Sequence, residues 1–270
     1  MSTARRATGY KPSKKKGPHI STMRGFKADA PLPDAVSLVQ FAGPVADQGQ
    51  TSSCVGQAVA RAIFIRQAVA GTPCAFPSPA WIYAMARVLE RGPTPVGTVP
   101  QPLQDDGCAP DEAIAAASTA LGWGAASGTA YPFNPDTIND EPSLEGAELG
   151  LCCVINAHYS IPTDAAAEQL VMQSLAHGYP IVRGGPCGDE TQKYPGGDAV
   201  IGSVVNPESG HETCIVGYDH NGPGGSLRFI EMNSWGLEWG NAGFGWTNSN
   251  WLADSQDLDA IEASTVREPS

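Results

Sequence analysis

The sequence predicts an α+β protein built as two lobes with a cleft between them. The first half of the chain contains segments with helical spacing of apolar residues, whereas the second half contains short runs rich in β-branched and aromatic residues bounded by Gly, Pro or Asn. Helices and strands that are segregated along a chain favour an α+β architecture. With 270 residues, 41% of them hydrophobic, the chain can bury the core of one large domain or two lobes.

The helices are expected in the first two thirds of the chain. Residues 54–70 carry apolar side chains at helical spacing, Ser52 and Ser53 can cap the start, and Gly71 can end the helix. Three further segments, each bounded by a capping residue, a proline or a glycine, predict helices over residues 79–90, 110–121 and 164–177.

The strands are expected after residue 180. Four short segments have strand composition and lie at residues 180–185, 213–219, 227–234 and 243–248. The division that follows is a basic arm over residues 1–30, a body over 31–253 with one lobe mainly in 45–132 and the other mainly in 150–250, and an acidic tail over 254–270. The arm and the tail are expected to be loose ends.

The charge is divided unevenly between the arm and the body. The net charge is −12, yet residues 1–28 hold eight of the sixteen basic residues and no acidic one, which leaves eight basic against 28 acidic residues in the remainder. An acidic body disfavours nucleic acid, except through the arm, and no apolar run is long enough to span a membrane. Residues 1–28 could dock on a partner or on the acidic body itself.

The seven cysteines predict free thiols. Their number is odd and no CxxC pair occurs, which fits neither a disulfide framework nor a zinc ribbon. The N-terminal segment lacks the apolar stretch of a secretory signal, so a cytoplasmic location is expected. Neither a metal site nor a cofactor is predicted.

Cys54 is the strongest candidate for a reactive residue. It stands where the stretch DQGQTSSC turns into the first helix, and a helix N-terminus lowers the pKa of a thiol. A nearby imidazole would take the proton and return it to a leaving group. The backbone N–H of Cys54 and the side-chain amide of Gln48 could stabilise the oxyanion.

Three motifs in order along the chain resemble the papain-like cysteine peptidases. PVADQGQTSSCVGQA resembles the nucleophile segment, GHETCIVGYD (residues 210–219) the histidine strand, and NSWGLEWGNAGFGW (residues 233–246) the asparagine segment. His211 follows Cys54 by 157 residues, and Asn233 follows 22 later. The resemblance covers about residues 32–248 and implies a helical left lobe, a β-barrel-like right lobe and an active site in the cleft.

The resemblance also implies roles for single residues. Cys54 would be the nucleophile, His211 the acid and base, Asn233 the residue that orients the imidazole, and Gln48 the oxyanion donor. The further substrate-binding or shielding residues implied by position are Trp235, Trp239, Asp106, Gly107, Ser52, Ser53 and Glu212.

Two positions beside the histidine depart from the usual pattern. Gly210 stands where many relatives have Asp or Asn, so one polar neighbour is lost. Glu212 stands where the second non-primed subsite is usually small and apolar, and it would favour Arg or Lys two residues before the cleaved bond. Alternatively, Glu212 points to solvent or pairs with a nearby base.

The predicted function is therefore that of a cysteine endopeptidase acting on polypeptides through an acyl-enzyme. Two alternatives stay open. The same triad could serve an acyl transferase or an amidase, because a triad determines the bond chemistry rather than the substrate. The chain could also be a non-catalytic binding or assembly protein on the same fold. With so short an N-terminal segment, the arm is a candidate for the control of activity.

Overall fold

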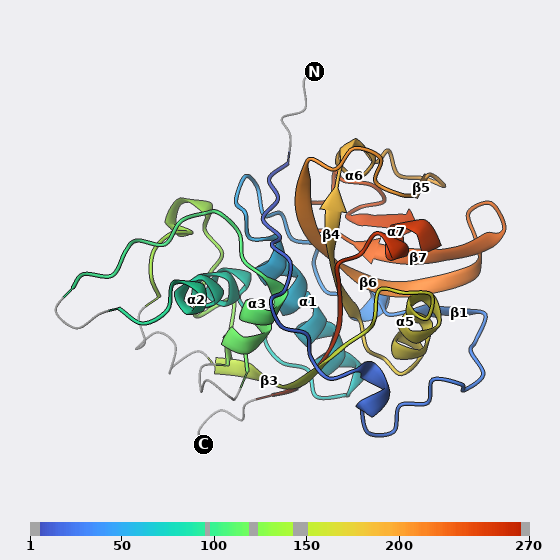
Figure 1. Cartoon of the computed structure of the whole chain (residues 1–270), viewed down its shortest axis with the longest axis horizontal. Helices are drawn as coiled ribbons and strands as arrows, with labels where there is room; N and C mark the ends of the chain where they lie inside the picture. Colours follow the sequence, from blue (N-terminus) through green and yellow to red (C-terminus); the bar gives the residue numbers. More distant parts are fainter. Residues whose placement is uncertain (1–5, 95–97, 119–123, 143–150, 266–270) are drawn as a thin grey trace.

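A computed structural model describes residues 6–94, 98–118, 124–142 and 151–265. A group of helices and a large sheet lie side by side, with α1 (Cys54–Val69) next to the sheet and α2 (Pro79–Arg91) and α3 (Pro110–Ala116) beyond it (Figure 1). The predicted α+β class is thus confirmed.

Helix α1 is the central element of the helical lobe. Twelve of its sixteen residues are buried, because it packs between α2 and the strands of the sheet. The expected capping by Ser52 and Ser53 is wrong: Ser53 is the N-cap residue but its hydroxyl bonds Thr51, while the Ser52 hydroxyl and amide bond Asp105.

The remaining helices are shorter. Helix α3 ends at Ala116, earlier than the predicted residue 121, and residues 119–121 lie outside the described part of the chain. The other helical segments are η1 (Ile20–Thr22), η2 (Val39–Phe41), η4 (Pro135–Thr137), α5 (Ala167–Ala176), α6 (Asp189–Gln192) and α7 (Ser249–Ala253). None of the helices in the described ranges is both long and apolar enough to cross a membrane.

The strands form one sheet. They are β1 (Ala35–Ser37), β2 (Ala125–Ala126), β3 (Leu151–Ser160), β4 (Ile181–Cys187), β5 (Val200–Ile201), β6 (Ser209–Gly222), β7 (Ser226–Met232), β8 (Phe244–Thr247) and β9 (Asp257–Thr265). Their order is β2-β3-β9-β4-β6-β7-β8-β5, with β1 paired to β6. Within the described strands this sheet is not closed, so the expected barrel-like lobe is corrected to an open, curved sheet.

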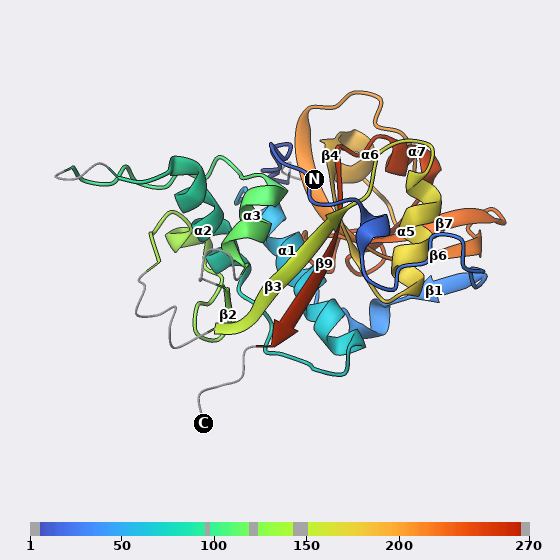
Figure 2. The same cartoon turned by 60° about the horizontal axis from the view of Figure 1, so that its bottom comes forward.

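The expected loose tail after residue 253 is wrong for residues 257–265. This segment is β9, which pairs with β3 on one side and β4 on the other, and Figure 2 shows it running beside the long β3. Its acidic residues suggested a tail, yet Asp257 and Asp259 are both buried.

The expected loose arm is wrong for most of residues 6–30. Ile20 is fully buried and Met23 nearly so, and both belong to the hydrophobic core. Upstream of them the chain crosses between the two lobes, where Tyr10 pairs with Cys108 as a parallel β-bridge (Figure 1, dark blue). The arm is therefore docked on the body.

Candidate active site

Cys54 is the first residue of α1 and is fully buried. The backbone N–H groups of Glu212, Gly9 and Val55 donate hydrogen bonds to its sulfur. Glu212 follows His211 on β6, and Gly9 belongs to the arm, so the sulfur lies where the two lobes and the arm meet.

The pKa of the Cys54 thiol contradicts the expected lowering at a helix N-terminus. Burial, with a smaller contribution from the negative charge of Glu212, raises this pKa to about 12, although the three backbone donors act in the opposite direction. Desolvation by burial therefore outweighs the effect of the helix start.

His211 is oriented by Asn233. The Nε2 atom of the buried imidazole lies 2.9 Å from the Asn233 Oδ1 atom, and Nδ1 has no hydrogen-bond partner within the described part of the chain. The Trp235 ring stacks on one face of the imidazole with 4.3 Å between centroids, and the His211 side chain as a whole is buried. Burial lowers the pKa of His211 to about 4 despite the Asn233 bond, which raises it.

Gln48 is fixed by bonds from both lobes. Its Oε1 accepts a 2.6 Å bond from the Ser234 hydroxyl, and its Nε2 donates to the Thr51 carbonyl at 2.8 Å and to the Ala7 carbonyl of the arm at 3.2 Å. The Ser234 N–H in turn donates to Asn233 Oδ1 at 2.7 Å. One hydrogen-bonded chain thus links Gln48 to His211.

The segment around Gly107 forms the helical-lobe wall of the cleft. Its amide donates to the Tyr83 hydroxyl at 3.0 Å, and that hydroxyl donates to Asp105 at 2.8 Å. Gly107 has φ of +87°, and a Cβ there would lie 1.9 Å from the Gly9 carbonyl oxygen of the arm. Asp106 points outward and pairs with Lys11 of the arm at 3.3 Å.

The two tryptophans lie on the sheet side of the cleft. Trp235 and Trp239 meet edge to face at 6.1 Å, and the Trp239 indole N–H donates to the Thr191 carbonyl at 2.8 Å. Gln192 follows Thr191, and its side-chain amide makes two hydrogen bonds with the backbone of Arg6. The start of the arm therefore lies beside Trp239.

Glu212 is neither in solvent nor paired. Its side chain is fully buried, and neither carboxyl oxygen has a hydrogen-bond partner within the described ranges, so both alternative interpretations of this residue are wrong. Burial, with the nearby carboxyls of Asp257 and Asp259, raises its pKa well above the usual range.

The arm passes through the site in an extended conformation. Its main chain is held by the bonds Tyr10 N to Gly210 O (3.2 Å), Cys108 N to Gly9 O (3.0 Å) and Lys11 N to Cys108 O (3.1 Å). Ion pairs between the arm and the body add to these and join Arg6 to Asp47, Lys11 to Glu90 and Asp106, Lys14 to Glu112, and Lys16 to Asp257. Docking of the basic arm on the acidic body, one of the two expected uses of its charge, is found here.

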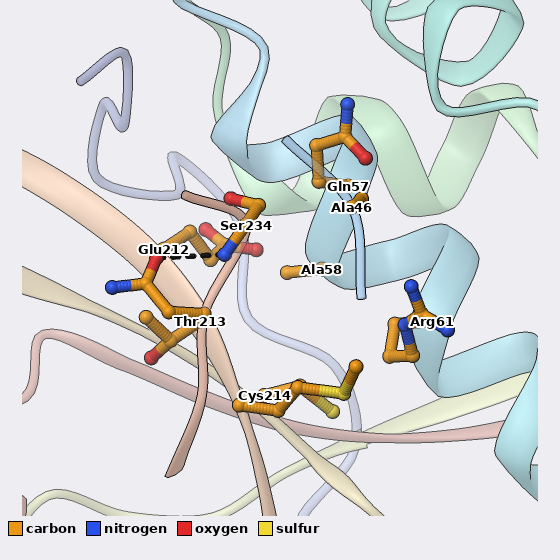
Figure 3. Close-up of a pocket in the computed structure, with 10 residues that line it drawn as sticks. Ala46, Gln57, Ala58, Arg61, Glu212, Thr213, Cys214 and Ser234 are labelled. Atoms are coloured by element: carbon orange, nitrogen blue, oxygen red, sulfur yellow. Dashed lines mark hydrogen bonds between the residues drawn. The ribbon is translucent and has the colours of Figure 1, made fainter. Parts of the chain in front are cut away.

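A small cavity lies below the site, between α1 and β6 (Figure 3). Glu212, Asn233 and Ser234 line it from the sheet, and Ala58 and Arg61 line it from α1. Its volume of about 10 Å³ has room for one water at most. A substrate side chain therefore does not fit here.

The residues expected at the site lie around the place where the two lobes and the arm meet. The sequence did not indicate several residues that hold them in position. Asp105 and Tyr83 position Gly107, Ser234 positions Gln48, and Asp257 binds the arm. The acidic run of β9 was the available signal for Asp257, and it was interpreted as a tail.

The family model of the papain family cysteine proteases matches residues 101–256, which is more than half of the chain. The chain therefore belongs to this family.

Single proteins that this chain resembles are also cysteine proteases. A stretch of 114 residues is 31% identical to the cysteine protease XCP2 of Arabidopsis thaliana, and it covers 42% of this chain and 30% of that protein. Among solved structures, xylellain, a cysteine protease from Xylella fastidiosa, superposes with a TM-score of 0.74 at 23% identity and covers 99% of this chain and 100% of its own. Digestive procathepsin L 3 of Tenebrio molitor gives a TM-score of 0.69 at 20% identity, covering 95% and 76%. At these identities the structural likeness establishes the fold.

Proposed function

We propose that this protein is a latent cysteine endopeptidase whose N-terminal arm occupies its substrate cleft. The observation that carries the proposal is the orientation of His211: Nε2 is held by Asn233 while Nδ1 is left without a partner among the described residues, in the strand segment that also touches the Cys54 sulfur. An imidazole fixed at one nitrogen and free at the other is suited to general acid and base chemistry.

The proposed reaction has two steps. The Cys54 thiolate attacks the carbonyl carbon of the scissile bond, Gln48 Nε2 and the Cys54 N–H stabilise the oxyanion, and the imidazolium of His211 gives its proton to the leaving amine. Water then attacks the thioester, with His211 taking its proton, and the acid product leaves as the thiol is restored. Asn233 holds the imidazole through both steps.

Three contacts support the view that the arm blocks this reaction. The Ala7 carbonyl accepts a hydrogen bond from Gln48 Nε2, and the Gly9 carbonyl accepts one from the Cys108 N–H. The Gly9 N–H is directed at the Cys54 sulfur. A substrate peptide needs the same groups, so the arm and a substrate exclude each other.

The direction of the arm explains why it can stay uncut. Arg6 lies beside the Trp239 segment, on the proposed leaving-group side, and Tyr10 lies beside Gly210, on the proposed acyl side. A substrate would run from the acyl side to the leaving-group side, whereas the arm runs the opposite way. The peptide groups of the arm therefore face the Cys54 sulfur in the opposite chain direction to those of a substrate.

The protonation states fit latency as well. Burial raises the Cys54 pKa to about 12 and lowers the His211 pKa to about 4, so both groups are neutral at pH 7 while the arm is docked. When the arm leaves, water returns to both groups and the thiolate–imidazolium pair becomes accessible.

Turnover of a short fluorogenic peptide under reducing conditions tests the proposal. The unmodified chain is expected to cleave the peptide, Cys54→Ala to be inactive, and Cys214→Ala, which removes another buried thiol, to retain activity. Selective labelling of Cys54 by an epoxysuccinyl inhibitor should parallel the activity. A folded chain that neither cleaves nor labels would support the binding or assembly alternative instead.

Two further parts of the proposal concern the acceptor of the acyl group and the cellular compartment. If added amines capture the acyl group faster than water does, the enzyme is an acyl transferase. None of the seven cysteines, all of which lie in the described ranges, forms a disulfide, which supports a reducing compartment such as the cytoplasm. A preference for basic residues near the cleaved bond is part of the proposed substrate class.

A further inference from the structure

Three thiols lie together at the end of α1 that is remote from Cys54. Cys74 belongs to the segment that follows α1, and Cys152 and Cys153 are consecutive residues of β3. The Cys74 sulfur is hydrogen-bonded with the thiols of both. Because α1 has sixteen residues, its two ends are about 24 Å apart. This thiol cluster is therefore separate from the proposed active site.

Main-chain contacts on both sides of Cys74 hold it against the start of β3. The Thr72 carbonyl accepts a 2.9 Å bond from the Thr265 hydroxyl, and Thr265 is aligned with Cys153 in the sheet. The Phe76 carbonyl accepts a 2.7 Å bond from a backbone N–H just beyond β2, the strand that pairs with β3 on its other edge. The approach of Cys74 to the other two thiols is thus set by the backbone.

A bulge in β3 explains how two consecutive thiols face the same segment. In the pairing with β2, Ala125 is aligned with Cys153 and the next residue of β2 with Leu151, so Cys152 is the extra residue. Consecutive residues of a regular strand point to opposite faces, whereas a bulge changes the direction of a side chain. Both thiols can therefore reach the segment that follows α1.

The three thiols differ in exposure and in charge. Cys74 is partly exposed, whereas Cys152 and Cys153 are buried. Hydrogen bonds from Cys152 and from Cys153 lower the pKa of the Cys74 thiol, although its partial burial acts in the opposite direction. The thiolate is the form of cysteine that reacts with oxidants. Cys74 thus combines an accessible sulfur, a stabilised thiolate and a second thiol in contact with it.

We propose that the thiol cluster is a redox site, in which hydrogen peroxide oxidises Cys74 and Cys152 then forms a disulfide with it. Cys152 is the better placed of the two partners, because the bulge leaves its side chain freer than that of Cys153, which is held in register between β2 and β9. A thiol cluster can also bind a soft metal ion. No group of three ligands within the described ranges, however, is arranged to hold a metal ion.

The reaction has two balanced steps. The Cys74 thiolate attacks one oxygen of hydrogen peroxide, so that an S–O bond forms, the O–O bond breaks and hydroxide leaves, which takes up a proton to become water. The sulfur of Cys152 then attacks the sulfur of the sulfenic acid, the S–S bond forms, and the hydroxyl group leaves with the proton of the Cys152 thiol as a second water. The two thiols lose two electrons and the peroxide gains them.

The disulfide would stabilise the helical lobe and spare the nucleophile. It closes the chain between residues 74 and 152, a long loop that contains α2 and α3, and closing a long loop restricts the unfolded chain. Cys54 is fully buried, and burial raises its pKa, so its thiol stays neutral and reacts slowly with peroxide. Oxidation thus changes the stability of the protein at a site that the proposed peptide hydrolysis does not use.

The test treats the full chain with limiting hydrogen peroxide. The remaining thiols are alkylated in denaturant, and the disulfides are mapped by mass spectrometry of the peptides. The expected product is a disulfide between Cys74 and Cys152, with Cys54 still reduced, and dithiothreitol should reverse it. The midpoint of thermal unfolding should rise by about 5 to 10 °C on oxidation.

Two variants provide the controls. Cys74→Ser should abolish the oxidation-dependent rise of the midpoint. Cys214→Ala, which removes a buried thiol outside the cluster, should retain it. If either variant fails to fold, the disulfide map of the unmodified chain still decides the question.

Three results would overturn the inference. They are oxidation of Cys54 ahead of Cys74, a disulfide that joins Cys74 to a residue other than Cys152, and an unchanged midpoint once the disulfide is complete. None of these measurements requires peptide cleavage. The redox site and the proposed peptidase activity can therefore fail independently.

Discussion

Replacement of Gly9 by alanine is expected to displace the arm without changing any residue of the body. A Cβ at Gly9 would lie 2.0 Å from the Ser52 carbonyl oxygen and 2.5 Å from the Ser52 Cβ. Ser52 cannot move aside easily, because Asp105 holds both its amide and its hydroxyl. The strain is therefore relieved by undocking of the arm.

The size of the effect follows from the hydrogen bonds that the strained arm of the variant can no longer make in its docked position. Three main-chain hydrogen bonds join residues 9–11 to the body. At about 1 kcal/mol each, their loss amounts to about 3 kcal/mol, which shifts the equilibrium between docked and open arm by about 150-fold. The initial rate should rise by up to that factor and level off once the cleft is mostly open.

The assay is the initial rate of peptide hydrolysis at a substrate concentration well below KM. Gly202→Ala is the control, because Gly202 has no positive φ and a Cβ there would make only an ordinary contact, 3.6 Å from the Asn248 Nδ2 atom. If Gly9→Ala and the unmodified chain cleave at the same rate, with both activities lost on Cys54→Ala, the arm does not block the site. This point variant is more informative than removal of residues 1–28, which would also take Ile20 and Met23 out of the core.

Two further predictions concern the imidazole. Asn233→Ala removes the 2.9 Å bond that orients His211, so kcat should fall roughly 10- to 30-fold with a smaller change in KM, and equal changes in both would argue against an orienting role. The second prediction concerns stability: burial lowers the His211 pKa from 6.5 to about 4, so the unfolded chain binds this proton more readily than the folded chain. Between pH 7 and pH 4 the unfolding free energy of the unmodified chain should therefore fall by about 3 kcal/mol relative to that of His211→Gln, measured by urea denaturation, and parallel pH curves would contradict the assignment.

The elements with regular patterns could be predicted from the sequence. Helix α1 and strand β6 follow the helical spacing and the β-branched composition that local physics requires. Strand β9 could not be recognised in this way, because its inward-facing Asp257 and Asp259 give it the composition of a tail. Their burial depends on Lys16 and Ser160, which are far away in the sequence.

The sequence motifs predicted which residues are candidates for the site, but they gave no indication that the arm lies on them. The motifs place Cys54, His211 and Asn233 in the chain, whereas nothing local indicates that residues 6–11 run between the lobes. The uneven charge of arm and body predicted only an attraction. For the same reason the pKa of Cys54 was expected to be lowered, since the sequence does not show that this residue is fully buried, with Gly9 of the arm beside its sulfur.

Ile20 and Met23 hold the C-terminal end of the arm in the core. This determines how the latent state would respond to dilution and to proteolysis. A blocking segment tethered about ten residues from its anchor stays near the cleft at an effective concentration in the millimolar range, whatever the protein concentration. Each opening is then transient and reversible. A cut between Gly17 and Pro18 would release the blocking segment for good and leave the anchor in place, whereas a cut beyond Met23 would free the anchor as well and expose the core beneath it.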